Sequence, residues 1–126
     1  MREIEFRGQN INGHWAHGNL AIIKEKLDRA EIGAYISNSA GAPFAYQVRP
    51  ETIGQYTGLK DKNGKKIFEG DIGWDEHNEC YGVVEFEEGK FLYVWENIAE
   101  DLWEVADGIE ICGNIHENPE LLEGTE

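Results

Sequence analysis

The chain has 126 residues, a length that suits one domain, or one barrel with an N-terminal extension, around a modest hydrophobic core. Its 40% hydrophobic residues predict a folded protein, and 15 glycines against 3 prolines predict many turns and short strands. No apolar run is long enough to span a membrane and no signal peptide is recognisable, so we expect no membrane partner and a cytoplasmic location.

The net charge of −14 is concentrated in the second half of the chain. Residues 1–60 hold seven Lys and Arg against six acids, whereas residues 61–126 hold four lysines against nineteen acids. Such an acidic half repels phosphate backbones, so we expect no direct binding to nucleic acid. Two interpretations remain open. The charge serves solubility, or it forms a surface that occupies a basic partner such as a host DNA-binding protein.

The N-terminal part predicts a β meander. Alternating residues at 2–6 place Ile4 and Phe6 on one face of a strand, and 9–13 predicts a turn. Further strands are expected at 15–23, 32–37 and 44–48, with a turn cluster at 38–41 and a stop at Pro50. The charged stretch 24–31 predicts either a solvated loop or one short helical turn.

Residues 55–72, with the sequence QYTGLKDKNGKKIFEGDI, predict a hairpin on which the rest of the chain is organised. Asn63 and Gly64 suit a type I′ turn, in which both central residues take positive φ. Apolar residues flank this turn on both sides, and Gly70 and Asp71 lead into a new strand. The stretch contains neither a nucleophile paired with a base nor a phosphate-binding loop.

A second hairpin is expected from residues 81–87 and 90–96 around Glu88 and Gly89. A two-residue loop pairs Phe86 with Phe91, Val84 with Tyr93, Gly82 with Trp95, Val83 with Val94 and Glu87 with Lys90. Gly82 then leaves room for the indole of Trp95. Residues 97–107 fit either a helix or a short strand. A closing strand is expected at 109–115, and Asn118-Pro119 predicts a last turn from which Leu121 and Leu122 dock back.

Three constellations could carry chemistry. Two pairs of zinc-type ligands are present, His14 with His17 and His77 with Cys80. The long linker between the pairs argues against a metal site, as does the three-residue spacing of His14 and His17, which places them on opposite faces of a strand. We therefore expect no metal and no cofactor. An enzyme of undetected mechanism, such as a nuclease or hydrolase, is the weakest interpretation, because these side chains form no catalytic motif.

The other two constellations also favour a structural interpretation. Cys112 and His116 resemble a nucleophile and base, yet a small buried cysteine in the closing strand is the more common outcome. Glu69 and Asp71 resemble paired carboxylates, but their place at a turn predicts hydrogen bonds to turn amides. We expect no catalytic residue.

The aromatic residues are the one feature that exceeds what a core of this size needs. A barrel of this length cannot easily bury all of them, and exposed aromatic residues mark interfaces, most simply with copies of the same chain. The possible interface residues are Trp15, Trp74, Trp95 and Trp103.

The central stretch resembles the signature of the YopX-like family of small bacteriophage and prophage proteins. Residues 52–72 carry most of the resemblance, and residues 1–7 and 111–122 match the family's two ends. Gly73 is a departure, because the family usually has a β-branched residue there, and Phe68 stands where Tyr is common. The signature residues are Gln55, Tyr56, Gly58, Leu59, Asp61, Asn63, Gly64, Ile67, Glu69, Gly70, Asp71, Gly113, Asn114, Asn118 and Pro119.

This resemblance implies a mostly β fold, with an SH3-like barrel in the C-terminal half, in a family without an established biochemical activity. We therefore expect a mainly β protein with one or two short helices, divided into a β subdomain at 1–54 and a hairpin-plus-barrel unit at 55–126. The expected function is that of a phage or prophage accessory protein in the bacterial host cytoplasm. It would act through contacts with a host or phage protein and form a homo-oligomer. The alternative is an acidic DNA mimic that inhibits a host nucleic-acid-binding protein.

Overall fold

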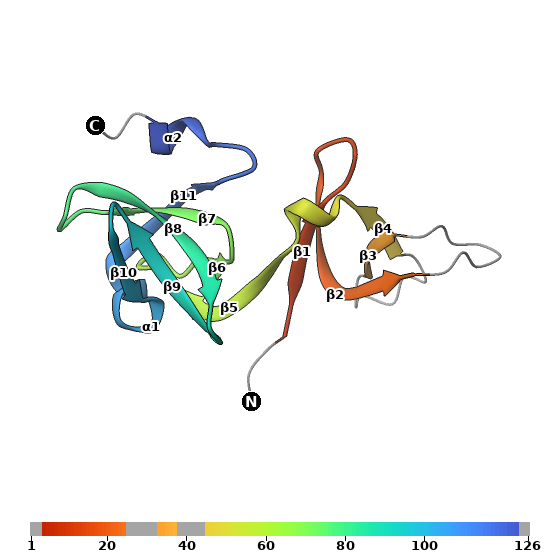
Figure 1. Cartoon of the computed structure of the whole chain (residues 1–126), viewed down its shortest axis with the longest axis horizontal. Coiled ribbons are helices and arrows are strands. Elements are labelled where there is room, and N and C mark those ends of the chain that lie inside the picture. Colours follow the sequence, from red (N-terminus) through yellow and green to blue (C-terminus); the bar gives the residue numbers. More distant parts are fainter. Residues whose placement is uncertain (1–3, 25–32, 38–44, 124–126) are drawn as a thin grey trace. The chain divides into compact units, whose positions relative to one another are not determined.

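The fold was obtained as a computed structural model that describes residues 4–24, 33–37 and 45–123. The chain forms two compact units, Met1–Gln55 and Tyr56–Glu126, and each has its own hydrophobic core. Antiparallel strands dominate both units, and the described residues hold two single-turn α-helices, which confirms the mainly β class expected from the sequence (Figure 1). The predicted loop or turn at 24–31 and the turn cluster at 38–41 fall almost entirely outside the described residues.

The first unit is the expected meander. Its sheet has the order β4-β3-β2-β1, after which β1 pairs with the first two residues of β5. The elements are β1 (Phe6–Gln9), β2 (Trp15–Ile23), β3 (Gly33–Ser37), β4 (Ala45–Val48), the 3-10 helix η1 (Pro50–Thr52) and β5 (Gly54–Lys60). The strands predicted at 15–23, 32–37 and 44–48 are thus present within one residue of the expected positions.

The first strand begins four residues later than predicted. Ile4 is exposed, whereas Phe6 packs against the core and Gly8 continues the inward face towards Val48. A Cβ atom on Gly8 would lie 2.8 Å from Val48 Cγ2, so the absent side chain lets β4 approach β1. An inward glycine is invisible to a search for alternating hydrophobic residues, which is why the pattern placed this strand too early.

The first sheet curls back on itself around its core. After β4, the N–H of Arg49 donates to the carbonyl of Gln9 at 2.8 Å, and the N–H of Gln9 donates to Thr52 Oγ1 at 2.8 Å. The core consists of Ala34, Ile36 and Val48, packed against Phe6, Ala16, Leu20 and Ile53. These hydrogen bonds tie the far end of the meander to its first strand.

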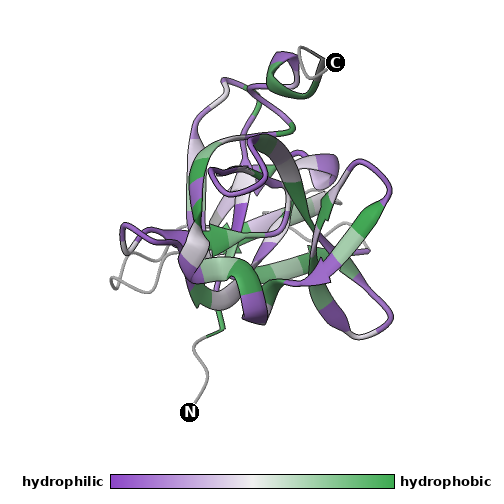
Figure 2. Ribbon diagram, turned by 90° about the vertical axis from the view of Figure 1, so that its left-hand side faces the viewer, coloured by the Kyte–Doolittle hydropathy of each residue, from purple (hydrophilic) through white to green (hydrophobic). Residues whose placement is uncertain are grey.

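The second unit contains a five-stranded antiparallel sheet with the order β10-β9-β8-β7-β11 and a separate pairing of β5 with β6. Its elements are β6 (Lys66–Phe68), β7 (Asp71–Asp75), β8 (Cys80–Glu87), β9 (Lys90–Trp95), β10 (Ile98–Asp101), α1 (Leu102–Val105), η2 (Ala106–Gly108), β11 (Ile109–Asn114) and α2 (Glu120–Glu123). Hydrophobic residues concentrate on the strands and hydrophilic ones on the turns (Figure 2).

The five-stranded sheet is barrel-like, although no strand pairing among the described residues closes it. The turn between β5 and β6 covers the free edge of β11 instead, because Lys62 N–H donates to the carbonyl of Ile109 at 3.0 Å. The core of this unit consists of Ile67, Val84, Tyr93, Leu102, Ala106, Ile109 and Ile111. The sequence left a helix and a short strand open for residues 97–107, and the structure contains both, because β10 leads directly into α1.

The pairing of β8 with β9 agrees with the register expected from the sequence. Phe86 faces Phe91, Val84 faces Tyr93 and Glu87 faces Lys90. The aromatic ring that uses the space above Gly82, however, belongs to Tyr93 and not to Trp95. A Cβ atom on Gly82 would lie 2.5 Å from Tyr93 Cζ.

Tyr93 explains why Gly73 can stand at a position expected to hold a β-branched residue. Gly73 pairs with Gly82, and a Cβ atom on Gly73 would lie 3.1 Å from Tyr93 Cε1. The Tyr93 hydroxyl also donates to the Gly73 carbonyl at 2.9 Å, which satisfies a polar group in a fully buried side chain. The absence of side chains on the two paired glycines therefore lets the Tyr93 ring pack against the backbone of β7 and β8.

The central hairpin forms, but its turn is not type I′. Gly64 has a φ of 84°, whereas Asn63 is not among the residues with positive φ. The N–H of Gly64 donates to the carbonyl of Asp61 at 3.0 Å, and the N–H of Asp61 donates to the carbonyl of Lys65 at 2.8 Å. This is the pattern of a type I turn followed by a left-handed glycine. The prediction was wrong because the Asp61 side chain stabilises the longer loop.

Candidate functional site

The buried carboxylate of Asp61 accepts three backbone hydrogen bonds. Oδ1 accepts from the N–H groups of Asn63 and Lys65, and Oδ2 accepts from the N–H of Ile111, each at 2.9 Å. Burial raises the pKa of Asp61, but the hydrogen bonds from Ile111, Lys65 and Asn63 outweigh it and hold the pKa below its ordinary value. This carboxylate joins the signature turn to β11, which is a structural role.

Neighbouring residues of the 52–72 stretch also build the fold. Thr57 is buried and its hydroxyl donates to the carbonyl of Ile67 at 2.9 Å, while the rings of Tyr56 and Phe68 pack with centroids 5.5 Å apart. The fully buried Asp71 accepts from the N–H of Phe68 at 2.7 Å. The sequence predicted that Glu69 and Asp71 accept hydrogen bonds from turn amides, and Asp71 accepts one such bond.

The C-terminal signature residues form a second hydrogen-bonded turn. The side-chain oxygen of Asn114 accepts from the N–H groups of His116 at 3.0 Å and Glu117 at 2.9 Å, and Asn118 Oδ1 accepts from Asn114 N–H at 3.2 Å. A Cβ atom on Gly113 would lie 2.3 Å from Asn118 Oδ1, so only glycine fits there without a shift of its neighbours. Pro119 then precedes α2, in which Leu121 and Leu122 are half-buried.

The four side chains considered for zinc are distributed over both units. His14 and His17 lie at the β1–β2 hairpin of the first unit, whereas His77 and Cys80 belong to the β7–β8 hairpin of the second. Cys80 is buried, and burial followed by the charges of Asp75, Glu96 and Glu100 raises the pKa of its thiol. Among the residues that the structure describes, no three His, Cys, Asp or Glu side chains gather as metal ligands would.

Cys112 is exposed, contrary to the expected buried cysteine. A register shift between Ile111 and Gly113 interrupts the pairing of β11 with β7, and Cys112 lies within this irregularity. Partial burial and the charge of Glu110 raise the pKa of the thiol, which disfavours the nucleophilic thiolate. Ile109 and Ile111 are buried, so regular strand alternation places Cys112 on the opposite, exposed face.

Two of the four tryptophans considered for an interface are half-buried with partners. The guanidinium of Arg7 lies 4.8 Å from the centroid of the Trp15 ring. Trp74 packs edge-to-face with Tyr81, its cross-strand neighbour, at a centroid distance of 4.9 Å. Both rings therefore already have contacts within their own unit.

Trp95 is also half-buried, packs against the core of the second unit and donates from Nε1 to Glu100 Oε2 at 2.6 Å. Trp103 is different, because it is 75% exposed. Its neighbour Leu102 is fully buried and Ala106 is 5% exposed, so both ends of the short helical segment are anchored in the core. Asp101 caps α1 by accepting from the N–H of Trp103 at 3.1 Å. The indole is thus presented on a well-anchored turn.

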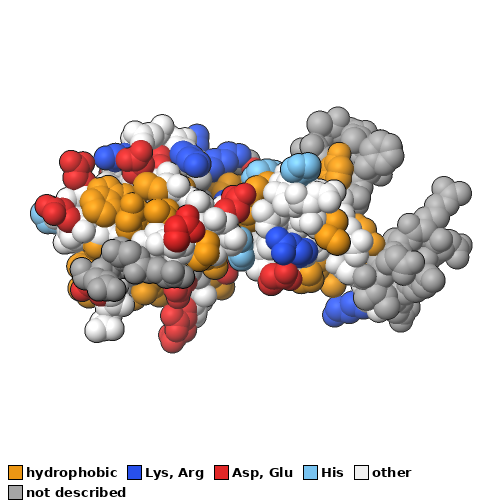
Figure 3. All heavy atoms as spheres, turned by 90° about the horizontal axis from the view of Figure 1, so that it is seen from above, with side chains coloured by type: hydrophobic (Ala, Val, Ile, Leu, Met, Phe, Trp, Pro, Cys, Tyr) orange, Lys and Arg blue, Asp and Glu red, His pale blue; other side chains and the backbone are white. Residues whose placement is uncertain are grey.

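The second unit carries the acidic charge of the chain. Residues 56–126 contain five lysines and nineteen Asp and Glu residues. Figure 3 shows carboxylates and hydrophobic side chains close together on one side of this unit. Of its described hydrophobic residues, Phe86, Ile98, Trp103 and Ile115 are the exposed large ones. The surface combines exposed apolar groups with negative charge.

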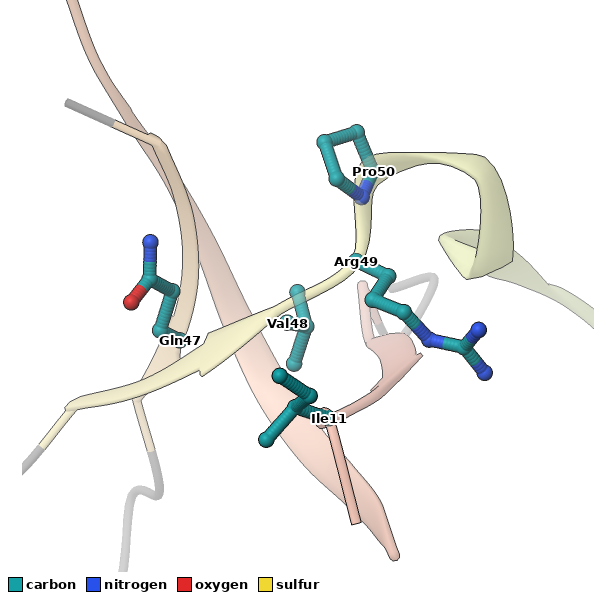
Figure 4. Close-up of a pocket in the computed structure, with 5 residues that line it drawn as sticks. All are labelled: Ile11, Gln47, Val48, Arg49 and Pro50. Carbon is teal, nitrogen blue, oxygen red and sulfur yellow. The ribbon is translucent and has the colours of Figure 1, made fainter. Parts of the chain in front are cut away.

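Two surface cavities that sequence reasoning did not identify lie among the described residues of the first unit. One, of about 370 Å³, is lined by Ile11, Gln47, Val48, Arg49 and Pro50 (Figure 4). The other, of about 360 Å³, is lined by Asn10, His14, Trp15, Ala16, His17 and Tyr46. An isoleucine at position 11, inside an otherwise polar turn, was the available sequence signal for the first cavity.

Fold and surfaces together define the class of protein: a small, acidic, two-unit antiparallel β protein whose signature residues form turns and strand contacts. The family model described as YopX protein matches residues 5–123, so the chain belongs to the YopX family, as the sequence resemblance indicated. The crystal structure of protein EF1440 from Enterococcus faecalis is similar, with a TM-score of 0.60 and 26% sequence identity, covering 97% of this chain and 99% of that one. No curated protein matches.

None of the described helices is long and apolar enough to cross a membrane.

Proposed function

We propose that this chain is a non-enzymatic accessory protein that acts through protein–protein contacts and associates with copies of itself. The observation that carries the proposal is Trp103, whose indole is 75% exposed on a turn anchored by Leu102 and Ala106. Exposing a tryptophan in this way forgoes hydrophobic stabilisation that burial would provide. Tryptophans are enriched among the residues that contribute most to binding, and an anchored backbone lowers the entropic cost of association.

The roles of the signature residues support a function without catalysis. Asp61, Asp71 and Asn114 use their side chains to hold backbone amides, and this leaves them engaged in the fold. The family resemblance supports an origin in a bacteriophage or prophage and action in the bacterial cytoplasm. A host or phage protein is the further partner that such an origin favours.

Sedimentation velocity over a hundredfold range of protein concentration tests self-association. We expect the weight-average sedimentation coefficient of the wild type to rise with concentration. Trp103→Ala is expected to weaken association about tenfold or more, because it removes the exposed indole. Phe86→Ala is the matched control, since Phe86 is a 50% exposed aromatic residue of the same unit whose ring already packs against Phe91. A wild type that stays monomeric throughout would remove self-association from the proposal.

A second candidate function is that of an acidic mimic of DNA that occupies a basic host protein. It is favoured by the fourteen excess negative charges of residues 56–126. Capture from host lysate at low and at high salt, with identification of bound proteins by mass spectrometry, separates the candidates. A nucleic-acid-binding protein lost at high salt supports the mimic, because salt screens exposed charges. A partner retained at high salt supports the aromatic contact.

A further inference from the structure

The cavity of about 370 Å³ in the first unit has an apolar wall and one cation. Val48, only 3% exposed, and Pro50 form part of this wall, and Ile11, 88% exposed, projects at the rim. Figure 4 shows Ile11 and Val48 pointing towards each other beneath Pro50, with Gln47 and Arg49 on opposite sides. The volume falls within the range of about 300–1,000 Å³ that is typical of ligand sites.

The cation at this cavity is held in place by hydrogen bonds. Arg49 Nη2 donates to Gln9 Oε1 at 2.6 Å, and Gln9 Nε2 donates in turn to the carbonyl of Gly13 at 3.1 Å. Glu51 lies 3.8 Å from Arg49 Nη1, and both side chains are about half-exposed or more, so this ion pair is weak. The guanidinium is therefore oriented yet accessible to another carboxylate.

The exposed Trp103 of the second unit has the complementary properties. A tryptophan side chain buries about 150–250 Å² of surface when it is enclosed, and this supplies a large hydrophobic gain. Glu104 follows it directly and is exposed, and Asp107 lies one helical turn further on and is exposed as well. Trp103 thus combines an apolar side chain with nearby negative charge, which matches an apolar cavity beside an arginine.

We infer that the Trp103 indole of one copy inserts into the cavity of Ile11, Val48 and Pro50 on a second copy, where Arg49 meets the carboxylates beside Trp103. This inference rests on the proposed self-association and specifies its contact. The indole and the cavity are different surfaces, so one such contact leaves a free cavity on one copy and a free indole on the other, and further copies can be added head to tail.

The alternatives on the same chain fit less well. Phe86 is less exposed than Trp103 and its ring contacts Phe91 at a centroid distance of 4.9 Å. The second cavity of the first unit is lined by the polar side chains of Asn10, His14 and His17 together with Trp15, Ala16 and Tyr46, and its lining includes no arginine. The cavity beside Arg49 is the better match in both polarity and charge.

A mixing experiment tests the head-to-tail contact. Ile11→Asp places a charge at the rim of the cavity, and Trp103→Ala removes the inserted group. Both side chains are exposed, so neither change should alter the urea midpoint. Each variant alone should associate about tenfold or more weakly than the wild type. Mixed together they should form 1:1 dimers and nothing larger, because only one intact cavity and one intact indole remain.

Matched controls separate the contact from general effects. Ile22→Asp introduces the same charge at a 54% exposed isoleucine of the first unit that does not line the cavity, and it should associate like the wild type. Glu51→Gln frees Arg49 from its competing carboxylate and should strengthen association about two- to fivefold, an effect that salt should diminish.

The outcomes distinguish this inference from the proposed function. Dimers in the mixture, with monomers in each variant alone, support the head-to-tail contact. A wild type that associates while the mixture stays monomeric overturns this contact and leaves self-association in place, because one intact indole and one intact cavity would then not hold two copies together. Undiminished association of Trp103→Ala overturns it too. A monomeric wild type removes both proposals.

Discussion

At the residue scale, Asp61 connects the family signature to the fold through one carboxylate. Its three backbone hydrogen bonds span the turn at residues 61–65 and the distant strand β11. Replacement by asparagine keeps the size but removes the charge and directs an N–H group at one of the donors. We expect Asp61→Asn to lower the free energy of unfolding by about 1.5–3 kcal/mol, measured by urea denaturation at pH 7. Asp107→Asn, at an exposed position, is the control and should be neutral.

The same carboxylate predicts a dependence on pH. The pKa of Asp61 is lower in the folded state than its ordinary value of 3.8, so its stabilisation is complete above that value and is lost as the pH falls through the folded-state pKa. We expect the wild type to lose more stability than Asp61→Asn does as the pH falls below 3.8, measured by urea midpoints at several pH values. Equal losses in both proteins would show that the Asp61 charge contributes nothing.

The second residue-scale prediction concerns the space beneath Tyr93. A Cβ atom at position 82 would lie 2.5 Å from the ring, against 3.4 Å or more for an ordinary contact. We expect Gly82→Ala to cost about 1–3 kcal/mol of unfolding free energy through overpacking. Gly108→Ala is the matched control, because nothing lies within 4 Å of the added atom. An equal loss of unfolding free energy in both variants would show that replacing glycine is itself destabilising and that contact with Tyr93 is not the cause.

At the element scale, the β8–β9 hairpin and the β5–β6 hairpin differ in how well the sequence predicts them. The first has Glu88 and Gly89 at positive φ in a two-residue loop, and strand alternation alone gives its register. The second was assigned the wrong turn, because the Asn-Gly pair is a local signal and Asp61 adds hydrogen bonds that favour a longer loop. A side chain that also binds a strand fifty residues away cannot be recognised from its own segment.

Gly64 provides a test of that turn. Its φ of 84° lies in the left-handed region, and a Cβ atom added there would meet nothing within 4 Å, so a substitution changes backbone energy alone. We expect Gly64→Ala to cost about 1–2 kcal/mol. Gly64→Asn should cost less, because asparagine tolerates this conformation better. Thermal unfolding of the three proteins measures the order, and an alanine variant as stable as the wild type would contradict the turn geometry.

At the scale of the whole molecule, the two hydrophobic cores share no residue. Ile36 lies in the first and Ile67 in the second, and both are fully buried. We expect Ile36→Ala and Ile67→Ala each to cost about 2–5 kcal/mol and their effects to add within about 0.5 kcal/mol. Urea denaturation of the single and double variants measures this. A coupling of more than about 1 kcal/mol would show that the two cores act as one.

The sequence by itself determined the features that depend on neighbours along the chain. Alternation and turn residues placed most strands, and the 52–72 motif indicated the family. The tertiary structure decided what depends on contacts between distant segments. These are the curled first sheet closed by Arg49 and Gln9, the ring of Tyr93 above Gly73 and Gly82, and the register shift between Ile111 and Gly113 in β11.

The proposed contact between Trp103 and the cavity beside Arg49 was likewise predictable from the sequence only in part. The surplus of tryptophans indicated an interface, but only burial distinguishes Trp103 from the three half-buried tryptophans. The cavity beside Arg49 joins residue 11 with residues 47–50, and no local pattern connects segments so far apart. The physical reason is that burial and cavities arise from packing between elements, whereas a sequence pattern reports only the preferences within each element.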